Sequence, residues 1–229
     1  MEQLYNGFQL HIPAGVFPLS TDSMLLADFA KLPKDAFVVD LGSGCGTLGM
    51  LLCAKDPGCQ VVGLEIDPVA HEAALSNAAD NAISHRLTSI CTDLRYISQH
   101  LSVGSADCCI SNPPYFSGGP VSLSVPNARR MDLCVTKELF SSAAWVLRYG
   151  GDFFIVHRPE QLAELCACAS AAGLEPKRLR LVRHAPSKPV SLILLQCRKG
   201  GKPGLTWEEL ILHNEDGTLT DACRKIYHL

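Results

Sequence analysis

The amino-acid sequence predicts an α/β protein built on a mostly parallel, doubly wound sheet. From Phe37 onward, short β-branched or apolar runs alternate with Ala-rich helical runs. A glycine-rich turn joins the first of these strands to the first helix, and after Gly173 two strands follow each other without a helix between them. Alternation of this kind is typical of parallel sheets, because consecutive parallel strands need a long crossover. The last two strands predict an antiparallel hairpin that closes the sheet.

The expected strands before that hairpin are short apolar runs, at residues 37–40, 61–66, 89–91, 108–110 and 153–156. The expected helices lie between and after them, at residues 47–55, 68–82, 137–148 and 159–172. Asp67 and Pro68 are typical of a helix start, with a capping side chain followed by proline in the first turn. In the third helix, apolar residues recur at helical spacing and predict one buried face: Leu139, Phe140, Ala143 and Leu147. The hairpin strands are expected at residues 177–182 and 190–196.

Composition excludes several classes of protein. The 229 residues, 47% of them hydrophobic, suit one globular domain. No apolar run approaches the ~20 residues that cross a bilayer. The N-terminus lacks the basic and then apolar pattern of a secretion signal. We therefore expect a soluble, cytoplasmic protein.

Eleven cysteines occur, with no C-x-x-C pair and no accompanying histidine cluster. Most lie in apolar runs, among them Cys53, Cys91, Cys108, Cys109 and Cys197. This pattern predicts small buried thiols in a reducing compartment and no metal site.

The glycine turn lies in the sequence VVDLGSGCGTLG, residues 38–49. Gly44, Gly46 and Gly49 match G-x-G-x-x-G, and Glu65 follows at the end of the second strand, where it can accept hydrogen bonds from ribose hydroxyls. Taken alone, this pattern also suits an NAD enzyme. The match is therefore a weak signal until further residues are considered.

Two more acids favour a different cofactor. Asp40 precedes the turn, which suits an ammonium group better than a pyrophosphate, and Asp93 ends the third strand, where it can meet an adenine amine. Three acids at the ends of successive strands suit S-adenosylmethionine, which carries an ammonium, a ribose and an adenine. Asp67 is expected to be only a helix cap. The expected cofactor-binding residues are Asp40, Gly42, Ser43, Gly44, Gly46, Glu65, Ile66, Asp93, Leu94 and Asn112.

The sequence SNPPYF, residues 111–116, follows the fourth strand. The exocyclic amine of an aromatic ring is a poor nucleophile, because its lone pair is delocalised. The Asn112 side-chain oxygen and the Pro113 carbonyl can accept both amine hydrogens, and Pro113 and Pro114 fix the backbone rigidly. Tyr115 can stack on the ring, which is worth ~1–3 kcal/mol per base. These four residues are the expected catalytic residues, although Asn-Pro-Pro is also a common turn signal.

Here the residues carry a family resemblance. D-x-G-x-G-x-G followed by N-P-P-Y resembles the amino methyltransferases that act on adenine, cytosine, guanine or glutamine amines. FPLSTDSMLLADF (17–29), SNPPYF and HAPSKPVSLILLQCRKGGKPGL (184–205) together resemble the bacterial tRNA(Val) adenine-N6 methyltransferase family. The resemblance implies a Rossmann-like class I methyltransferase fold with seven strands, and tRNA as the partner.

The resemblance also implies that Asn112 and Tyr115 grip the adenine 3′ of the anticodon, and that Thr21 and Asp22 lie near the cofactor. The lead-in sequence departs from the family where Ser20 stands in place of an expected glycine. We expect three parts of one monomer: a cofactor-capping lead-in, the methyltransferase domain and a packed tail, at residues 1–36, 37–204 and 205–229.

A basic stretch covers residues 177–202, with eight Lys and Arg residues and no acid. Arg178 and Arg180 share one face of a strand by alternation. Such a cluster suits RNA phosphates, and it also suits an edge strand protected against further pairing. The expected RNA-binding residues are Arg178, Arg180, Arg183, Lys188, Arg198, Lys199 and Lys202.

Other features are less specific. The Gly- and Ser-rich residues 117–125 are a candidate substrate lid or a disordered connection, and His157 is expected to be a satisfied core residue. Three other functions remain open: a protein-glutamine methyltransferase of the release-factor type, a non-catalytic RNA-binding relative and an NAD oxidoreductase. The first carries an N-terminal helical domain for which 36 residues are too few, and the last lacks a hydride-handling pair.

Overall fold

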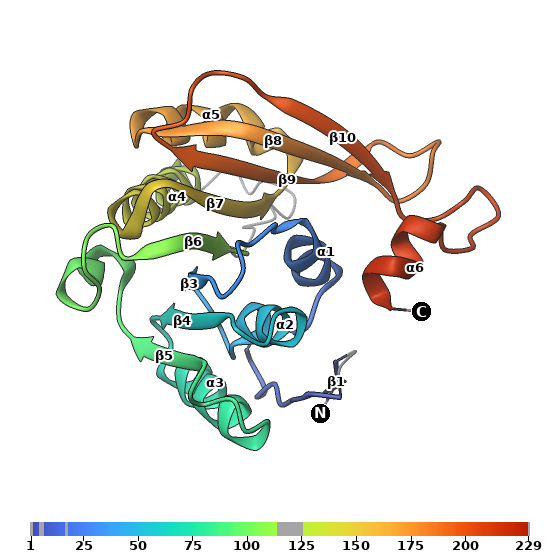
Figure 1. Cartoon of the computed structure of the whole chain (residues 1–229). Helices are drawn as coiled ribbons and strands as arrows, with labels where there is room; N and C mark the ends of the chain where they lie inside the picture. Colours follow the sequence, from blue (N-terminus) through green and yellow to red (C-terminus); the bar gives the residue numbers. More distant parts are fainter. Residues whose placement is uncertain (1, 5–6, 17, 114–125, 229) are drawn as a thin grey trace.

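The computed structural model describes residues 2–4, 7–16, 18–113 and 126–228, with the side chains of residues 126–135 outside the description. One central sheet carries helices on both faces (Figure 1). Its strands are β3 (Phe37–Leu41), β4 (Gln60–Glu65), β5 (Leu87–Cys91), β6 (Ala106–Ser111), β7 (Leu147–His157), β8 (Leu174–Arg183), β9 (Val190–Lys199) and β10 (Thr206–Ile211). A separate antiparallel pair near the N-terminus consists of β1 (Glu2–Gln3) and β2 (Gln9–Leu10).

The helices are α1 (Thr21–Phe29), α2 (Thr47–Lys55), α3 (Pro68–Asp80), α4 (Pro126–Val146), α5 (Leu162–Ala171) and α6 (Asp221–Tyr227). Two short 3₁₀ turns are η1 (Leu94–Gln99) and η2 (Pro159–Gln161). The predicted helix at residues 47–55 matches α2, and Asp67 caps α3 by accepting a hydrogen bond from the Val69 backbone N–H at 3.0 Å, as expected.

The strand order is β10-β8-β9-β7-β6-β3-β4-β5. Strands β7, β6, β3, β4 and β5 pair in parallel, whereas β9 runs antiparallel to both β7 and β8. The predicted class is therefore confirmed: a mostly parallel sheet with an antiparallel hairpin near the C-terminus. Because β9 is antiparallel to both of its neighbours, β8 points the same way as β7.

Side-chain alternation divides the interior into two cores, one on each face of the sheet. Val38 and Phe154 belong to the core beneath α1 and α2, and their neighbours Val39 and Phe153 belong to the core beneath α4 and α5. Strands buried on both faces are apolar almost throughout, which explains why these strands were recognisable in the sequence.

Helix α4 differs from its prediction at both ends. It begins at Pro126 rather than near residue 137, and it ends at Val146, so Leu147 starts β7 instead of completing the helix. Leu139, Phe140 and Ala143 form the expected buried face, and Leu147 is buried from the strand. Helical spacing could not detect this change, because Leu147 contributes to the same core from either element.

The sheet contains an eighth strand that the sequence did not indicate. Residues 206–211, expected as part of a polar tail, form β10 and pair in parallel with β8. The strand has one buried residue, Leu210, while Trp207 is 70% exposed. A strand at the edge of a sheet with so little burial has no alternating pattern to recognise.

Two asparagines hold the lead-in on α3. The Asn77 side chain pairs with the backbone N–H and C=O of His11, and the Asn81 side chain pairs with both backbone groups of Gln9, each at 2.8–2.9 Å. An amide side chain carries both an N–H donor group and a carbonyl acceptor, so each asparagine satisfies the lead-in backbone as a neighbouring strand would. The lead-in then continues toward α1.

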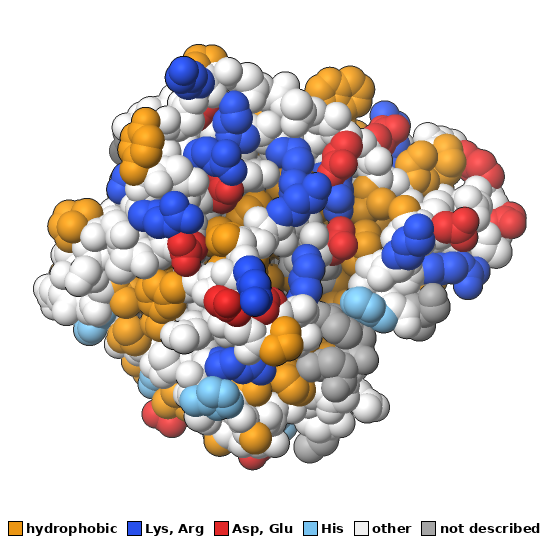
Figure 2. Space-filling model, in the orientation of Figure 1, with side chains coloured by type: hydrophobic (Ala, Val, Ile, Leu, Met, Phe, Trp, Pro, Cys, Tyr) orange, Lys and Arg blue, Asp and Glu red, His pale blue; other side chains and the backbone are white. Residues whose placement is uncertain are grey.

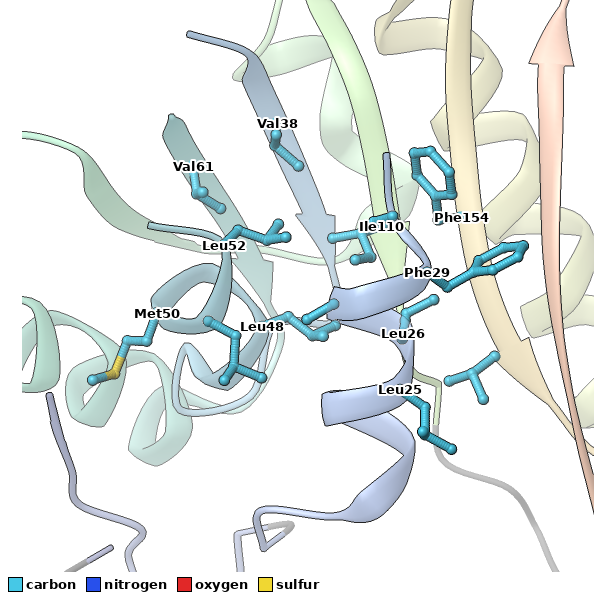
Figure 3. Close-up of a cluster of buried hydrophobic side chains, with 14 of the residues drawn as sticks. Leu25, Leu26, Phe29, Val38, Leu48, Met50, Leu52, Val61, Ile110 and Phe154 are labelled. Atoms are coloured by element: carbon cyan, nitrogen blue, oxygen red, sulfur yellow. The ribbon is translucent and has the colours of Figure 1, made fainter. Parts of the chain in front are cut away.

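Helix α1 packs its apolar side onto the sheet. Leu25, Leu26 and Phe29 are fully buried (Figure 3). The Phe29 ring meets the edge of Phe154 of β7, with ring centroids 6.2 Å apart. Ser20 caps the helix by accepting a hydrogen bond from the Ser23 backbone N–H. The lead-in thus ends in a helix fixed against the centre of the sheet.

The cysteines of the described residues are free thiols, and eight of the ten are buried. Cys91 is exposed, contrary to the prediction, because it ends β5 at the edge of the sheet. Among the described helices, none combines the length and the apolar character that a bilayer crossing requires.

Candidate active site

A cavity of about 410 Å³ opens at the edge of the sheet where β3, β4, β5 and β6 end. Eight of the ten expected cofactor-binding residues line it: Gly42, Ser43, Gly44, Glu65, Ile66, Asp93, Leu94 and Asn112. Asp40 and Gly46 do not line the cavity. The carboxyl ends of parallel strands meet at one edge, so residues distant in sequence converge here.

The glycine turn leaves its backbone open to the cavity. Gly44 has a positive φ of 55°, and a Cβ atom at this position would meet nothing within 4 Å. A ligand can therefore approach the backbone closely, and only glycine adopts this conformation without strain. Gly49 serves packing instead, because a Cβ atom there would lie 2.5 Å from the Leu87 side chain.

Glu65 ties the turn to the end of β4. Its carboxylate accepts hydrogen bonds from the backbone N–H groups of Gly44 at 2.7 Å and Asp67 at 2.8 Å, one at each oxygen. Each carboxylate oxygen has two lone pairs, so each retains acceptor capacity. Glu65 thus shapes the turn as well as lining the cavity.

Asp40 is a buried acid with no hydrogen-bond partner among the described residues. It is 1% exposed, and neither carboxyl oxygen bonds to any described residue. Burial, followed by the nearby charge of Glu65, raises the pKa of Asp40 to about 8. The Ser43 hydroxyl, which does line the cavity, also has no partner among the described residues. Buried polar groups without partners are costly, and of these two the Ser43 hydroxyl is the one that a ligand in the cavity could reach.

Asp93 has partners of its own. It caps η1 by accepting a hydrogen bond from the Arg95 backbone N–H, and the Arg95 guanidinium binds both carboxylate oxygens, at 2.6 Å in the shorter contact. The hydrogen bonds from Arg95 hold the pKa of Asp93 below its usual range. Asp93 is thus placed at the cavity as expected, but its carboxylate is shared with Arg95.

Asn112 follows β6 directly and lines the cavity. Its side-chain Nδ2 donates a hydrogen bond to Ser23 Oγ of α1 at 3.0 Å. Strand β6 is anchored just before it, where the buried Ser111 hydroxyl donates to the Leu41 carbonyl at 2.7 Å. Pro113 is half-buried, while Pro114 and Tyr115 lie outside the described residues, as do residues 117–125.

The sequence missed several cavity residues. Val16 and Pro18 of the lead-in, Ser23 of α1 and Glu138 of α4 all line the cavity. The capped helix start Ser20-Thr-Asp-Ser23 is a signal that could have indicated α1. Thr21, which was expected near the cofactor, instead accepts a hydrogen bond from the Tyr227 hydroxyl at 3.1 Å.

The basic residues of β8 mainly bind other parts of the chain. Arg178 donates to the Phe29 carbonyl and lies 4.0 Å from the centre of the Phe29 ring. Arg180 forms ion pairs with Asp28 at 2.8 Å and Glu208 at 2.7 Å. The two share one face, as expected, and that face holds α1. Blue and red side chains lie next to each other over this part of the molecule in Figure 2.

Other residues of this basic set also have intramolecular partners. Arg183 pairs with Glu209 of β10, and Arg198 pairs with Asp152 of β7 at 2.8 Å. Lys199 Nζ donates to the Ala144 and Leu147 carbonyls at 2.6 and 2.7 Å. Lys188 and Lys202 are exposed.

The topology does not gather the expected RNA-binding residues into one patch. Strand β8 points the same way as β6, so Arg183 and the following Lys188 lie at the same edge of the sheet as Asn112. Arg198, Lys199 and Lys202 lie at the opposite edge, because β9 is antiparallel. A strand of ten residues separates the edges by roughly 30 Å.

His157 ends β7, and its Nδ1 accepts a hydrogen bond from the Arg158 backbone N–H at 2.9 Å.

Among the described residues, no group of three His, Cys, Asp or Glu side chains is arranged to hold a metal ion.

Comparison with known proteins agrees with this geometry. The model of the methyltransferase small domain family matches residues 10–165. A protein of Bacteroides fragilis named tRNA1(Val) (adenine(37)-N6)-methyltransferase is 30% identical over 182 residues, which cover 77% of this chain and 75% of the relative. A protein of Photobacterium profundum with the same name is 26% identical, and the match covers 91% of this chain and 90% of that relative.

Solved structures share the fold. A predicted O-methyltransferase of Agrobacterium tumefaciens superposes with a TM-score of 0.77 at 21% identity, covering 91% of this chain and 96% of that chain. TrmN from Thermus thermophilus gives 0.60 at 17% identity, covering 77% of this chain and 48% of that chain. The family match spans the glycine turn, the lead-in and Asn112 together. The chain belongs to the methyltransferase small domain family, and within it to the group of relatives named tRNA1(Val) (adenine(37)-N6)-methyltransferases.

Proposed function

We propose that this protein transfers a methyl group from S-adenosylmethionine to the N6 amine of an adenine in tRNA. The observation that carries the proposal is the position of Asn112, at the rim of a cavity formed by the glycine turn and the ends of three further strands. The names of the relatives supply the acceptor, adenine 37 of tRNA1(Val), which lies 3′ of the anticodon.

The residues of the cavity fit S-adenosylmethionine. Its volume of about 410 Å³ lies within the usual range of ~300–1,000 Å³ for ligand pockets. The open backbone at Gly42, Ser43 and Gly44 would receive the methionine part of the cofactor. Asp40, which lies just before this turn, would attract the ammonium group of the cofactor from behind the turn backbone. Glu65 retains acceptors for the ribose hydroxyls. Ile66, Asp93 and Leu94 would receive the adenine. Gly46 would serve the site by starting helix α2 directly after the glycine turn.

The acceptor chemistry requires two hydrogen-bond acceptors beside the methyl donor. S-adenosylmethionine supplies an activated methyl group on a cationic sulfur, so the protein has to position the amine and bind its hydrogens. The Asn112 Oδ1 and the Pro113 carbonyl would accept the two amine hydrogens, which draws the nitrogen lone pair out of the ring. Pro114 would keep this backbone rigid, and Tyr115 would stack on the flipped base.

The tRNA would approach the Asn112 edge of the sheet. Lys188 lies at this edge, is exposed and would meet phosphates nearest the target, whereas Arg183 at the same edge is paired with Glu209. Lys202 and its neighbours would meet RNA only if it extends along the sheet. We propose a cytoplasmic monomer that needs no metal, because displacement at a sulfonium requires none.

The test supplies tritiated S-adenosylmethionine together with small RNA from cells that lack this gene, and in parallel with total protein. We expect label in a tRNA, recovered as N6-methyladenosine after digestion to nucleosides. Label confined to protein would replace the proposal with glutamine methylation. Binding of the cofactor with no label in either fraction would contradict the assignment of a macromolecular acceptor.

A further inference from the structure

Ser23 links the helix α1 to the residue that would bind the acceptor. It is 3% exposed, and its hydroxyl accepts the hydrogen bond from Asn112 Nδ2 at 3.0 Å. Both residues line the same cavity. We infer that Ser23 is a positioning residue that sets the orientation of the Asn112 amide, an inference that rests on the proposed function.

Orientation matters because an amide side chain has two unlike ends. One end donates hydrogen bonds and the other accepts them, and the two ends lie on opposite sides of the amide. A primary amine also donates, so the Nδ2 end would repel it. With Nδ2 bound to Ser23, Oδ1 would be the end presented to the amine. The Ser23 hydroxyl would thus favour the productive orientation of the amide.

A second serine supports the direction of this hydrogen bond, from Asn112 Nδ2 to Ser23 Oγ. Ser20 Oγ lies 3.5 Å from Ser23 Oγ and also accepts the Ser23 backbone N–H at 3.4 Å. A hydroxyl has one hydrogen and two lone pairs. If Ser23 directs its hydrogen toward Ser20, its lone pairs face Asn112, and the amide must present its donor end. In that arrangement the capped start of α1 favours the Nδ2 end of Asn112 facing Ser23.

The far end of α1 is fixed as well. Lys55 Nζ donates to the carbonyls of Ala27, Asp28 and Ala30 at 3.0, 3.3 and 3.3 Å. Arg178 donates to the Phe29 carbonyl. These cations satisfy carbonyls that the end of a helix leaves unpaired and favour its negative end. Ser23 is consequently held by a helix that is secured at both ends.

The central experiment compares Ser23→Ala with Ser89→Ala in the methyl-transfer assay. Ser89 is a matched control, since it is also a buried serine, and its hydroxyl bonds to His71 at 2.8 Å away from Asn112. We expect Ser23→Ala to lower kcat by about 10- to 100-fold, with the KM for S-adenosylmethionine unchanged, and Ser89→Ala to retain the wild-type kcat. Equal kcat values in the two variants would overturn the inference.

Repeating the Ser23→Ala substitution in the Asn112→Asp variant separates the orientation of the Asn112 amide from the packing of Ser23. A carboxylate accepts at both oxygens, so Asn112→Asp has no orientation to set. In this background we expect Ser23→Ala to lower the remaining kcat by less than about threefold. A full loss of 10- to 100-fold in both backgrounds would mean that Ser23 acts through something other than the amide.

A readout without turnover keeps the inference separate from the proposed function. The Asn112 side-chain amide signals in a ¹⁵N NMR spectrum are assigned by their loss in Asn112→Asp. We expect these signals to shift in Ser23→Ala and to remain in place in Ser89→Ala. Unshifted signals in Ser23→Ala would overturn the inference. Wild-type protein that labels no RNA, together with shifted signals, would overturn the proposed function alone.

Discussion

Two regions of the molecule treat their charged groups in opposite ways. At the end of β3, the Asp40 carboxyl is buried with no hydrogen-bond partner among the described residues. Across β8 and β10, by contrast, Arg180 binds Asp28 and Glu208, and Arg183 binds Glu209. A buried polar group without a partner costs free energy, while a paired one does so much less. The first region leaves its buried acid without a partner among the described residues, whereas in the second Arg180 and Arg183 are already paired within the fold.

The difference shows that a cluster of charges along the sequence is a poor guide to a binding surface. The basic run of residues 177–202 has no acid in the sequence, yet acids from α1, β7 and β10 meet it in space. The glycine turn has few charges, and Asp40 just before it is a buried acid without a hydrogen-bond partner among the described residues. Variants in the two regions should therefore differ in kind.

The largest effect is expected for Asn112→Ala. Loss of the side-chain acceptor should lower kcat by at least about 10²–10³-fold, because the stabilisation of the reacting amine is lost. The affinity for S-adenosylmethionine, measured by calorimetry, should change little. A variant with normal turnover would contradict the proposed role of the NPPY sequence.

Asp40→Asn should change how stability depends on pH. The pKa of Asp40 is about 8 in the folded protein, above its value of 3.8 in a model peptide. The folded state therefore binds the proton more tightly, and stability falls as pH rises from about 4 to about 8. The loss over this window is on the order of a few kcal/mol.

Asparagine at this position cannot titrate, so the contribution of Asp40 to the pH dependence should disappear. Urea unfolding at pH 5, 6, 7, 8 and 9 measures it as the difference between wild type and Asp40→Asn. The free energies of unfolding should converge at low pH, apart from a constant offset, and diverge toward pH 8. A difference that is independent of pH would show that Asp40 titrates normally.

Arg180→Ala and Lys202→Ala test the second region. Arg180 is 15% exposed and binds two acids, so its removal should lower the free energy of unfolding by about 2–3 kcal/mol. Lys202 is exposed, and its removal should change stability by less than about 0.5 kcal/mol. Urea unfolding separates the two.

RNA binding gives the complementary result. If Lys202 meets a phosphate, Lys202→Ala should reduce the slope of log affinity against log salt by about 1. Arg180→Ala should leave that slope unchanged, because its charge is already neutralised by Asp28 and Glu208. A reduced slope for Arg180→Ala would return β8 to the RNA-binding surface.

The smallest effect is expected for Asp67→Ala, which removes the cap of α3. It should lower the free energy of unfolding by about 1 kcal/mol and leave kcat unchanged. Asp80→Ala, at the C-terminal end of the same helix, is the matched control and should slightly stabilise the protein, because an acid there opposes the helix dipole. A marked loss of cofactor affinity in Asp67→Ala would instead make Asp67 a ligand.

The parts predicted best are those in which local pattern and burial agree. Helix α2 was located to the residue, and the apolar strands β3, β4, β6 and β7 were found because both of their faces are buried. The tail was predicted least well, since β10 has one buried side chain and is a strand only because β8 offers it an edge.

The same distinction applies to the candidate site. The glycine turn and SNPPYF were recognisable because their chemistry depends on consecutive residues. Ser23 was not, since its contact with Asn112 joins positions 89 residues apart. The lead-in was expected to cap the cofactor, and Val16 and Pro18 do line the cavity.

The sequence by itself determined the α/β class, the glycine turn, the three acids at the ends of successive strands, and the placement of Asn112 after a central strand. Each of these depends on local periodicity, turn chemistry or the rule that parallel strands end at one edge. Tertiary structure alone decided which charges remain without a partner, which end of the sheet each cation occupies, and which hydroxyl faces the Asn112 amide. Those outcomes depend on strand order and on contacts between distant segments, and a linear pattern carries no information about either.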